Sequence, residues 1–135
     1  MKTVFLDANI LFSAAYSEQA ALLRIWKLRS VILHTSAYAL EEARRNLRDE
    51  QSLARLKRLI EGLSLVPEAD TRFIPSSVIL REKDKPILAA AIAARAQYLV
   101  TGDSRDFGTF FGKTVAGLMV LPPRDFLGVM ESTQK

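Results

Sequence analysis

The sequence predicts a single α/β domain with a central, mainly parallel sheet flanked by helices. Short apolar runs alternate with longer segments of helical period along all 135 residues. These runs are continuously apolar, which is typical of strands that are buried on both faces of a parallel sheet. About half of the residues are apolar (49%), and the chain has the length of one domain without repeats or a linker.

The first half of the chain contains strands that are each followed by helical segments. We expect strands at residues 3–6, 31–34 and 63–66, and helices at 8–16, 17–29, 36–47 and 50–62. Ser17 is a suitable N-cap for the second helix, and Gly62 ends the fourth. Pro67 stops the third strand, because proline cannot donate a hydrogen bond to a sheet.

The second half begins with a loop at residues 68–77, where no period is visible. A helix follows at 84–96, with Asp84 as its N-cap and Pro86 in its first turn. We expect strands at 98–101 and 115–121 and a short helix at 124–130. The predicted domain therefore spans residues 1–130, and residues 131–135 form a polar C-terminal tail.

Composition excludes several kinds of site. The chain has no cysteine, which excludes disulfides, thiolate zinc sites and a cysteine nucleophile. His34 is its only histidine, which excludes catalysis by a pair of histidines and most zinc sites. The longest wholly apolar run, residues 87–94, is too short to span a membrane, and Asp7 interrupts the apolar N-terminus. We therefore expect a cytoplasmic protein without a membrane segment.

Acidic side chains occur where charge is costly. Asp7 and Asp103 follow apolar runs that are predicted strands, Asp84 begins a predicted helix, and Glu42 lies on another. Ligands of open α/β sheets bind beyond the carboxyl ends of strands. Carboxylates gathered there repel one another unless a cation lies between them, so the pattern indicates a divalent metal site.

Each acid also has a structural interpretation. Asp84 alone is explained as an N-cap, and Asp103 alone as a turn residue after Gly102. Asp7 is harder to explain in this way, because a carboxylate directly after a buried strand loses hydration. Glu41 and Glu42 flank the apolar face of their helix on opposite sides, so helical period does not distinguish them.

Four segments together resemble the motifs of PIN-domain ribonucleases, the group that includes the VapC-type toxins of toxin–antitoxin pairs. They are FLDANIL at residues 5–11, EARRNL at 42–47, DKPILAAA at 84–91 and LVTGDSRDF at 99–107. The resemblance covers about residues 4–127 and favours Glu42 over Glu41. It implies a Rossmann-like PIN domain, Mg²⁺ or Mn²⁺ as cofactor, single-stranded RNA as substrate, frequent homodimers and an antitoxin partner.

Hard cations such as Mg²⁺ and Mn²⁺ prefer oxygen ligands. A site made of carboxylates, without His or Cys, supplies only such ligands. We expect Asp7, Asp84 and Asp103 to hold the metal directly or through water, and Glu42 to bind through water or to orient the attacking water. Asn9 and Thr101 are expected as neutral side chains that orient a carboxylate or a metal-bound water. Asp106 is expected either as a fifth acid behind the carboxylates or as a cap. Without a histidine pair, water attack that leaves a 5′-phosphate is the expected reaction.

Basic residues follow Glu42 closely in the sequence. The chain carries a net charge of +4, which suits a polyanionic partner but also fits an ordinary basic protein. The basic residues of the two neighbouring helices form the candidate RNA-binding surface: Arg44, Arg45, Arg48, Arg55, Lys57 and Arg58. The alternative is a solvated helix face.

Three other classes of protein remain open. A phosphatase of the haloacid dehalogenase type needs a second Asp two residues after the first, where this chain has Asn9. A dinucleotide-binding domain needs a glycine-rich first turn, which residues 7–12 lack. The third is a catalytically degenerate module that binds RNA or protein, and the presence of all four acids argues against it.

Overall fold

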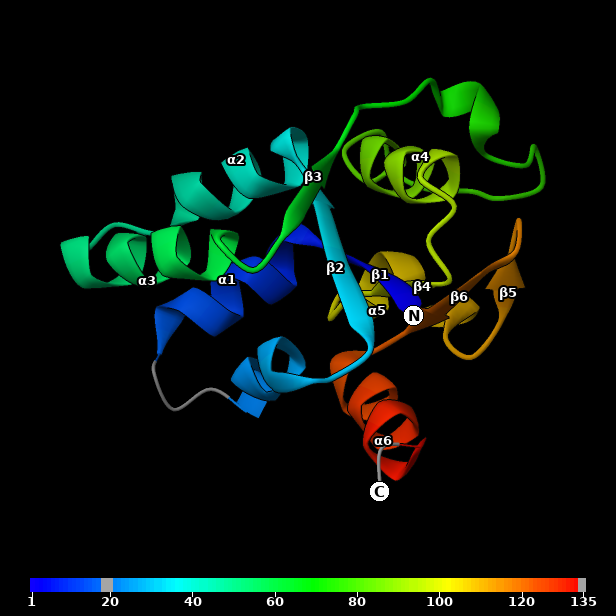
Figure 1. Cartoon of the computed structure of the whole chain (residues 1–135). Coiled ribbons are helices and arrows are strands. Elements are labelled where there is room, and N and C mark those ends of the chain that lie inside the picture. The colour runs from blue at the N-terminus through cyan, green and yellow to red at the C-terminus, as the bar shows by residue number, and fades with distance from the viewer. Residues whose placement is uncertain (18–20, 134–135) are drawn as a thin grey trace.

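The structure is a computed structural model that describes residues 1–17 and 21–133 of the chain. A six-stranded sheet forms its centre, in the order β3-β2-β1-β4-β6-β5 (Figure 1). The strands are β1 (Lys2–Leu6), β2 (Val31–Ser36), β3 (Ser64–Val66), β4 (Tyr98–Val100), β5 (Thr114–Val115) and β6 (Leu118–Leu121). Neighbouring strands are parallel except for the antiparallel pair β5–β6. The predicted α/β class with a mainly parallel sheet is confirmed.

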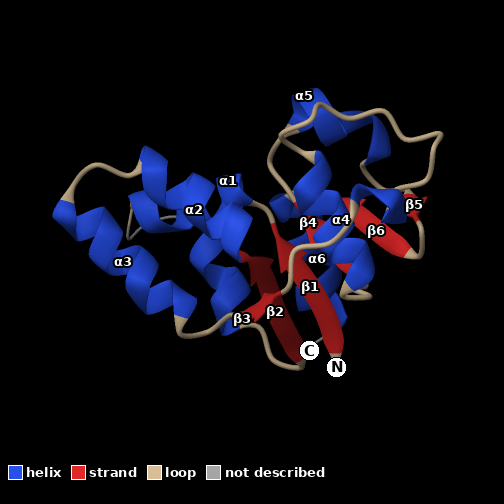
Figure 2. Ribbon diagram, turned by 90° about the horizontal axis from the view of Figure 1, so that it is seen from above, coloured by secondary structure: helices blue, strands red, loops and turns tan. Residues whose placement is uncertain are grey.

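Helices cover both faces of this sheet. The α-helices are α1 (Ala8–Tyr16), α2 (Ala37–Asn46), α3 (Glu50–Ile60), α4 (Lys85–Ala93), α5 (Ser104–Phe107) and α6 (Pro123–Thr133). Figure 2 shows α1, α2 and α3 grouped beside β1 and β2, and α4 close to β4 and β6. Crossovers between parallel strands are right-handed, so the direction in which the chain moves along the sheet decides the face that each helix covers.

The centre of the core is formed by β1, β4 and the helix α4. Residues 4–6 of β1 and residues 99–100 of β4 are fully buried. Three alanines of α4, residues 89–91, are also fully buried, and their small side chains let the helix lie close to the sheet. The buried strands hold the backbone rigidly at the point where the acidic motifs begin.

Two helix starts are capped by side chains that were not predicted as caps, Ser36 and Asp49. The Ser36 hydroxyl accepts a hydrogen bond from the Ala39 N–H at the start of α2. The Asp49 carboxylate accepts one from the Ser52 N–H at the start of α3. Each bond satisfies a backbone donor that the helix itself leaves unpaired.

Two predicted elements are corrected. The helix expected at 17–29 is a 3₁₀-helix, η1 (Ala21–Lys27), and the expected helical residues 18–20 lie outside the described residues. Ile25 is fully buried and the Trp26 indole N–H donates to the Leu59 carbonyl. These tertiary contacts, rather than the helical period, determine the tighter winding.

The single strand expected at 115–121 is a hairpin of β5 and β6. Ala116 and Gly117 connect the strands with φ values of 51° and 83°. Two-residue turns with positive φ match the twist of paired strands, and glycine adopts this conformation without a steric cost. The segment reverses direction because of this turn.

Short helical segments also occur where none was expected. Within the predicted loop, Asp70 caps the 3₁₀-helix η2 (Thr71–Phe73) by accepting from the Arg72 N–H. After β4 the chain forms α5 and then a further 3₁₀ turn, η3 (Gly108–Phe110). None of the described helices is both long enough and apolar enough to cross a lipid bilayer.

Candidate metal centre

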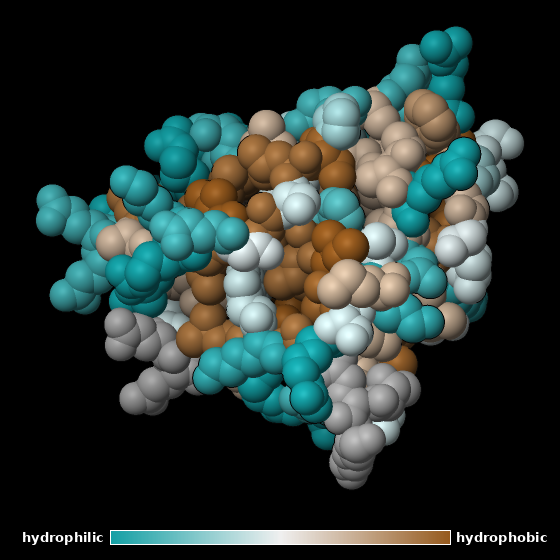
Figure 3. All heavy atoms as spheres, viewed as in Figure 1, coloured by the Kyte–Doolittle hydropathy of each residue, from teal (hydrophilic) through white to brown (hydrophobic). Residues whose placement is uncertain are grey.

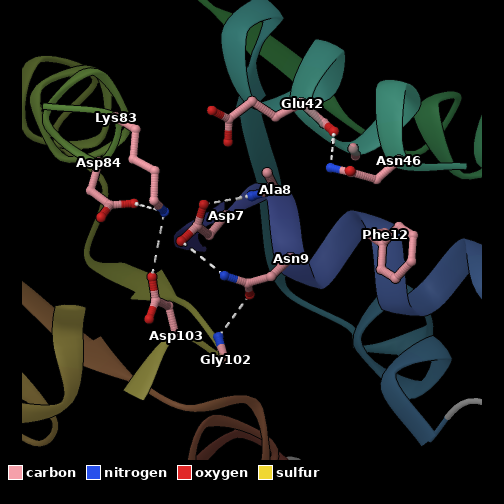
Figure 4. Close-up of a pocket in the computed structure, with 11 residues that line it drawn as sticks. Asp7, Ala8, Asn9, Phe12, Glu42, Asn46, Lys83, Asp84, Gly102 and Asp103 are labelled. Carbon is pink, nitrogen blue, oxygen red and sulfur yellow. Dashed lines mark hydrogen bonds and ion pairs between the residues drawn. The ribbon is translucent and has the colours of Figure 1, made fainter. Parts of the chain in front are cut away.

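The acidic motifs meet at the carboxyl ends of β1 and β4. These strands are neighbours in the sheet, and the strand order reverses here, as at the ligand sites of other open α/β sheets. A pocket of about 580 Å³ opens at this point (Figure 4). It is lined by Asp7, Ala8, Asn9, Phe12, Glu42, Ala43, Asn46, Lys83, Asp84, Gly102 and Asp103.

Asp7 forms one wall of the pocket and is held by hydrogen bonds to both carboxylate oxygens. Its Oδ1 accepts from the Ala8 N–H at 2.6 Å, and its Oδ2 accepts from the Thr101 hydroxyl at 2.8 Å and from the Asn9 amide at 3.2 Å. Only 3% of the residue is exposed. Burial raises the pKa of Asp7 above its usual value, although the bonds from Thr101 and Ala8 act against this.

Asn9 joins the ends of the two strands. Its Nδ2 donates to Asp7 and to the Thr101 hydroxyl, and its Oδ1 accepts from the Gly102 N–H at 2.8 Å. A Cβ atom at Gly102 would lie 3.3 Å from this Oδ1, so glycine permits the close approach. The Thr101 hydroxyl also accepts from the Asp103 N–H. This network holds the Asp7 carboxylate in one orientation. The role predicted for Asn9 and Thr101 at a metal site is part of the proposal below.

Asp84 forms the second wall. It occupies the N-cap position of α4, but its side chain makes no capping hydrogen bond. The residue is 4% exposed, and its Oδ2 is buried without a hydrogen-bond partner among the described residues. Burial and the neighbouring Asp106 raise the pKa of Asp84 to about 6. A carboxylate that is neither a cap nor fully paired has the character of a ligand group.

Asp103 is the N-cap of α5, and Asp106 lies in the first turn of this helix. One oxygen of Asp103, Oδ1, caps this helix by accepting from the N–H groups of residues 105 and 106. The Arg81 guanidinium donates to both carboxylate oxygens of Asp106, from Nε to Oδ1 and from Nη2 to Oδ2, and this lowers the pKa of Asp106 below its usual value. Carboxylate oxygens of Asp84, Asp103 and Asp106 lie within 4.8 Å of one another.

Glu42 reaches the pocket from α2, and Glu41 does not line it. Glu41 is exposed and forms a bidentate ion pair with Arg44 at 2.6 and 2.9 Å. Tyr38, also on α2, donates its hydroxyl to the Lys83 carbonyl at 2.8 Å. Burial, with hydrogen bonding and charge from Glu42, raises the pKa of Tyr38 to about 12. Tyr38 therefore remains protonated and ties α2 to the segment that carries Asp84.

Lys83 brings positive charge into the pocket. Its Nζ lies 3.2 Å from Asp84, 3.7 Å from Asp106 and 3.9 Å from Asp103. Burial lowers the pKa of Lys83, but the hydrogen bond to Asp84 and the three carboxylate charges outweigh this, so the pKa lies above its usual value. The side chain is therefore a cation among three acids.

The structure brings the four predicted acids, residues 7, 42, 84 and 103, into one pocket. It also places Asp106 in the close group, where the first of its two interpretations, a fifth acid or a cap, would have it. The sequence indicated that Asp103 and Asp106 could lie together, because residues three apart on a helix are neighbours. Lys83, Phe12 and Asn46 line the pocket without having been predicted. Only the adjacency of Lys83 to Asp84 pointed to any of them.

The predicted basic residues differ in what their side chains contact. Arg44, Arg45 and Arg48 are exposed, and Arg44 pairs with Glu41. Arg55 donates to the carbonyls of Ala15 and Tyr16 at the end of α1 at 2.7 and 2.8 Å. Figure 3 shows hydrophilic side chains at the end of the molecule where α3 lies in Figure 1. This basic surface lies beside the helix that carries Glu42.

The pocket fits a hard divalent cation. Its acidic groups offer only oxygen ligands, which suit Mg²⁺ or Mn²⁺. The buried Oδ2 of Asp84 lacks a partner, and five carboxylates are balanced by the side chains of Arg81 and Lys83 among the described residues. A bound cation would satisfy this oxygen and relieve the repulsion.

Fold and pocket together define an α/β domain with a carboxylate site at the end of a parallel sheet. A comparison with protein families matches residues 3–105 to the PIN domain. Because this match covers most of the chain, the protein belongs to the PIN domain family. The resemblance inferred from the four motifs is confirmed.

A comparison with solved structures agrees on the fold. The chain is similar to a chain of VapBC2 from Rickettsia felis, whose crystal structure includes a DNA fragment from the VapBC2 promoter. The TM-score is 0.67 and the identity 18%, over 89% of this chain and 98% of that chain. At this identity the similarity concerns the fold alone. A search of curated proteins found no match.

Proposed function

We propose that the protein is a metal-dependent endoribonuclease that cleaves single-stranded RNA and acts as the toxin of a toxin–antitoxin pair. The observation that carries this proposal is the pocket itself. Five carboxylates converge at the end of the sheet of a PIN domain, and one of them keeps a buried oxygen without a partner. The fold similarity to a chain of VapBC2 supports an antitoxin partner.

Asp84, Asp103 and Asp106 would hold Mg²⁺ or Mn²⁺, with Asp7 bound directly or through water. When bound, such a cation lowers the pKa of a water nucleophile and neutralises charge that grows on the phosphate. Asp7 is kept in one orientation by three donors, so it needs little reorganisation on binding. Asp103 offers its Oδ2 to the pocket because its Oδ1 is used as a cap.

Glu42 faces these acids from α2 and would orient the attacking water or bind the cation through water. The hydroxyl of Tyr38 joins the backbone next to Asp84 to the same helix, which holds the two walls together. Neutral Asn9 and Thr101 keep the Asp7 carboxylate aligned without adding charge. The pocket thus contains both a group to direct water and groups to hold the cation.

The exposed residues Arg44, Arg45 and Arg48 would track the RNA backbone, since they lie on or next to the helix that carries Glu42. Arg55 was predicted for this surface, but its guanidinium is bonded to the end of α1. We therefore assign Arg55 to the stability of the fold. We also propose a homodimer, which sedimentation of the purified protein would test.

Cleavage of a 5′-labelled single-stranded RNA tests the proposal. We expect cleavage with Mg²⁺ or Mn²⁺, none with chelator, and products with a 5′-phosphate. Asp84→Asn is the control for a contaminating nuclease, because this variant should be inactive. Chelator-resistant cleavage or cyclic phosphate products would contradict the proposal. Metal binding without RNA cleavage would favour a binding module, and hydrolysis of a simple phosphomonoester would favour a phosphatase.

A further inference from the structure

Lys83 lies where a cation of the acidic site would lie. Its Nζ is 3.2–3.9 Å from oxygens of Asp84, Asp103 and Asp106. These are the same three acids whose oxygens lie within 4.8 Å of one another. Figure 4 shows the Lys83 side chain reaching between Asp84 and Asp103. The ammonium is therefore the internal counter-ion of the close acidic group.

The two cationic side chains at this group differ in their freedom to move. The planar guanidinium of Arg81 makes bidentate contacts with Asp106, a geometry that fixes its orientation. Lys83 has a compact ammonium on a flexible stem, and half of its side chain (50%) is exposed. Lys83 can swing towards solvent, whereas Arg81 is held.

Movement of the Lys83 side chain does not require movement of its backbone. The Lys83 carbonyl accepts the hydrogen bond from the Tyr38 hydroxyl at 2.8 Å. The N–H of the next residue, Asp84, donates to the Arg81 carbonyl at 3.0 Å. The carboxylate of Asp84 therefore keeps its place while the neighbouring ammonium changes position.

A divalent cation and the ammonium cannot share the same three carboxylates. Like charges a few ångströms apart repel each other, and the ammonium and the metal would each lose carboxylate oxygens to the other. Binding of the metal must therefore displace Nζ. An ammonium displaced by a few ångströms remains at the mouth of the pocket, where a phosphate that approaches the acids would meet it.

We propose that Lys83 is an exchangeable cation of this site: it neutralises the acids before metal binds, yields its position to the metal, and then holds the scissile phosphate. This inference rests on the proposed metal-dependent nuclease. The inference assigns Lys83, whose charge is opposite to that of the acids, two successive roles: neutralising the acids and then holding the phosphate. It also predicts that loss of Lys83 separates metal affinity from activity.

The first arm of the test measures metal binding without RNA. Free Mn²⁺ is counted by electron paramagnetic resonance during titration of the parent, Lys83→Met and Lys83→Arg. Lys83→Met removes the charge and keeps the length, so Mn²⁺ should bind about tenfold more tightly or better, as expected for a charge within 4–6 Å. Lys83→Arg keeps the charge and should not gain affinity. In chelator, Lys83→Met should melt at a lower temperature than the parent.

Lys85 supplies the matched control. It lies two residues away and pairs with Glu82 at 2.7 Å, and it does not line the pocket. Lys85→Met makes the same change of net charge and should leave Mn²⁺ affinity unchanged. If Lys83→Met is unfolded in chelator, the Mn²⁺ concentration that restores its folded signal gives the affinity instead.

The second arm measures RNA cleavage at saturating Mn²⁺. Lys83→Met should cleave at least about tenfold more slowly than the parent, although it binds Mn²⁺ more tightly. A merely structural lysine would lower both affinity and rate. Unchanged or weaker Mn²⁺ binding by Lys83→Met would overturn the exchange, and unchanged cleavage would overturn the phosphate role. A parent that binds Mn²⁺ without cleaving RNA would refute the proposed function, while the first arm would still decide the exchange.

Discussion

The two walls of the acidic pocket hold their carboxylates in different ways. On the wall formed by β1 and α1, Asp7 accepts three hydrogen bonds from residues of the fold. On the wall formed by α4, Asp84 makes no cap bond and leaves Oδ2 buried without a partner among the described residues. Hydrogen bonds from the fold therefore orient Asp7, whereas Asp84 keeps an oxygen that is available to a ligand.

The same distinction separates other pairs of like residues. Glu41 is engaged by Arg44, while Glu42 faces the pocket. Arg55 is engaged by backbone carbonyls, while Arg48 is exposed beyond α2. Away from the pocket, as at Glu41 and Arg55, we expect a charged side chain that the fold bonds to act on stability. Side chains that line the pocket or stay exposed are expected to act on function, and Asp7 on both. The predictions below test this rule from the largest effect to the smallest.

The largest expected effect is on RNA cleavage. Asp84→Asn and Asp7→Asn should each lower the cleavage rate by about a hundredfold or more, because cation binding contributes several kcal/mol to such reactions. Glu42→Gln should also lower the rate strongly, and Glu41→Gln should not. Rates are measured at saturating Mg²⁺ on one RNA. An equal loss of cleavage rate in Glu42→Gln and Glu41→Gln would contradict the distinction between Glu41, which pairs with Arg44, and Glu42, which lines the pocket.

The second effect concerns pH and the metal-free protein. Because burial raises the pKa of Asp84 from 3.8 to about 6, the folded state binds its proton more tightly than the unfolded state. Stability in chelator should therefore fall as pH rises from about 4 to about 6, by an amount on the order of 3 kcal/mol, and then stay level. Asp106, whose pKa is lowered, acts in the opposite direction below about pH 4.

Urea denaturation across this range is the measurement, and Asp84→Asn is the informative variant. It should lose the part of the decline that Asp84 causes and be more stable than the parent at pH 7, while the part caused by Asp7, whose pKa is also raised by burial, remains. Asp7→Asn should gain less stability at pH 7. Its new amide N–H groups would face the hydrogen-bond donors that now bind Asp7, and a buried group without a partner costs about 1–3 kcal/mol. Identical curves for the two variants would mean that the walls do not differ.

The third effect is on stability alone. Arg55→Gln should destabilise the protein by about 1–2 kcal/mol, because its guanidinium caps the carbonyl end of α1. Arg48→Gln, on the exposed surface, should change stability by less than about 0.5 kcal/mol. Thermal denaturation in chelator gives both values. A larger loss for Arg48→Gln would contradict the assignment of Arg55 to the fold.

The smallest effect is on the salt dependence of RNA binding. If Arg48 contacts a phosphate, its loss should flatten the plot of log affinity against log salt by about 0.7, the value for one contact with a single strand. Binding is measured in an inactive Asp7→Asn background, and several RNA sequences should weaken alike. An unchanged slope would mean that this surface faces solvent or a protein partner.

The amino-acid pattern was sufficient for the class of fold and for most of the acids. Continuous apolar runs identified β1, β2 and β4, because burial on both faces leaves no alternation along these strands. Asp7 and Asp103 were recognised because each directly follows such a run. The pattern was insufficient for the hairpin of β5 and β6, where Ala116 and Gly117 form an unrecognised turn. It was also insufficient for η1, whose winding follows its packing on α3.

The sequence by itself therefore determined the parallel α/β domain and the acids at its strand ends, because both are written in local patterns of burial and charge. Only the tertiary structure decided which side chains are free. It brought Asp106 beside Asp84 across 22 residues of chain, placed Lys83 among three carboxylates, and turned Arg55 onto α1. Such contacts join segments that are distant in the sequence, and their geometry depends on how helices pack on the sheet.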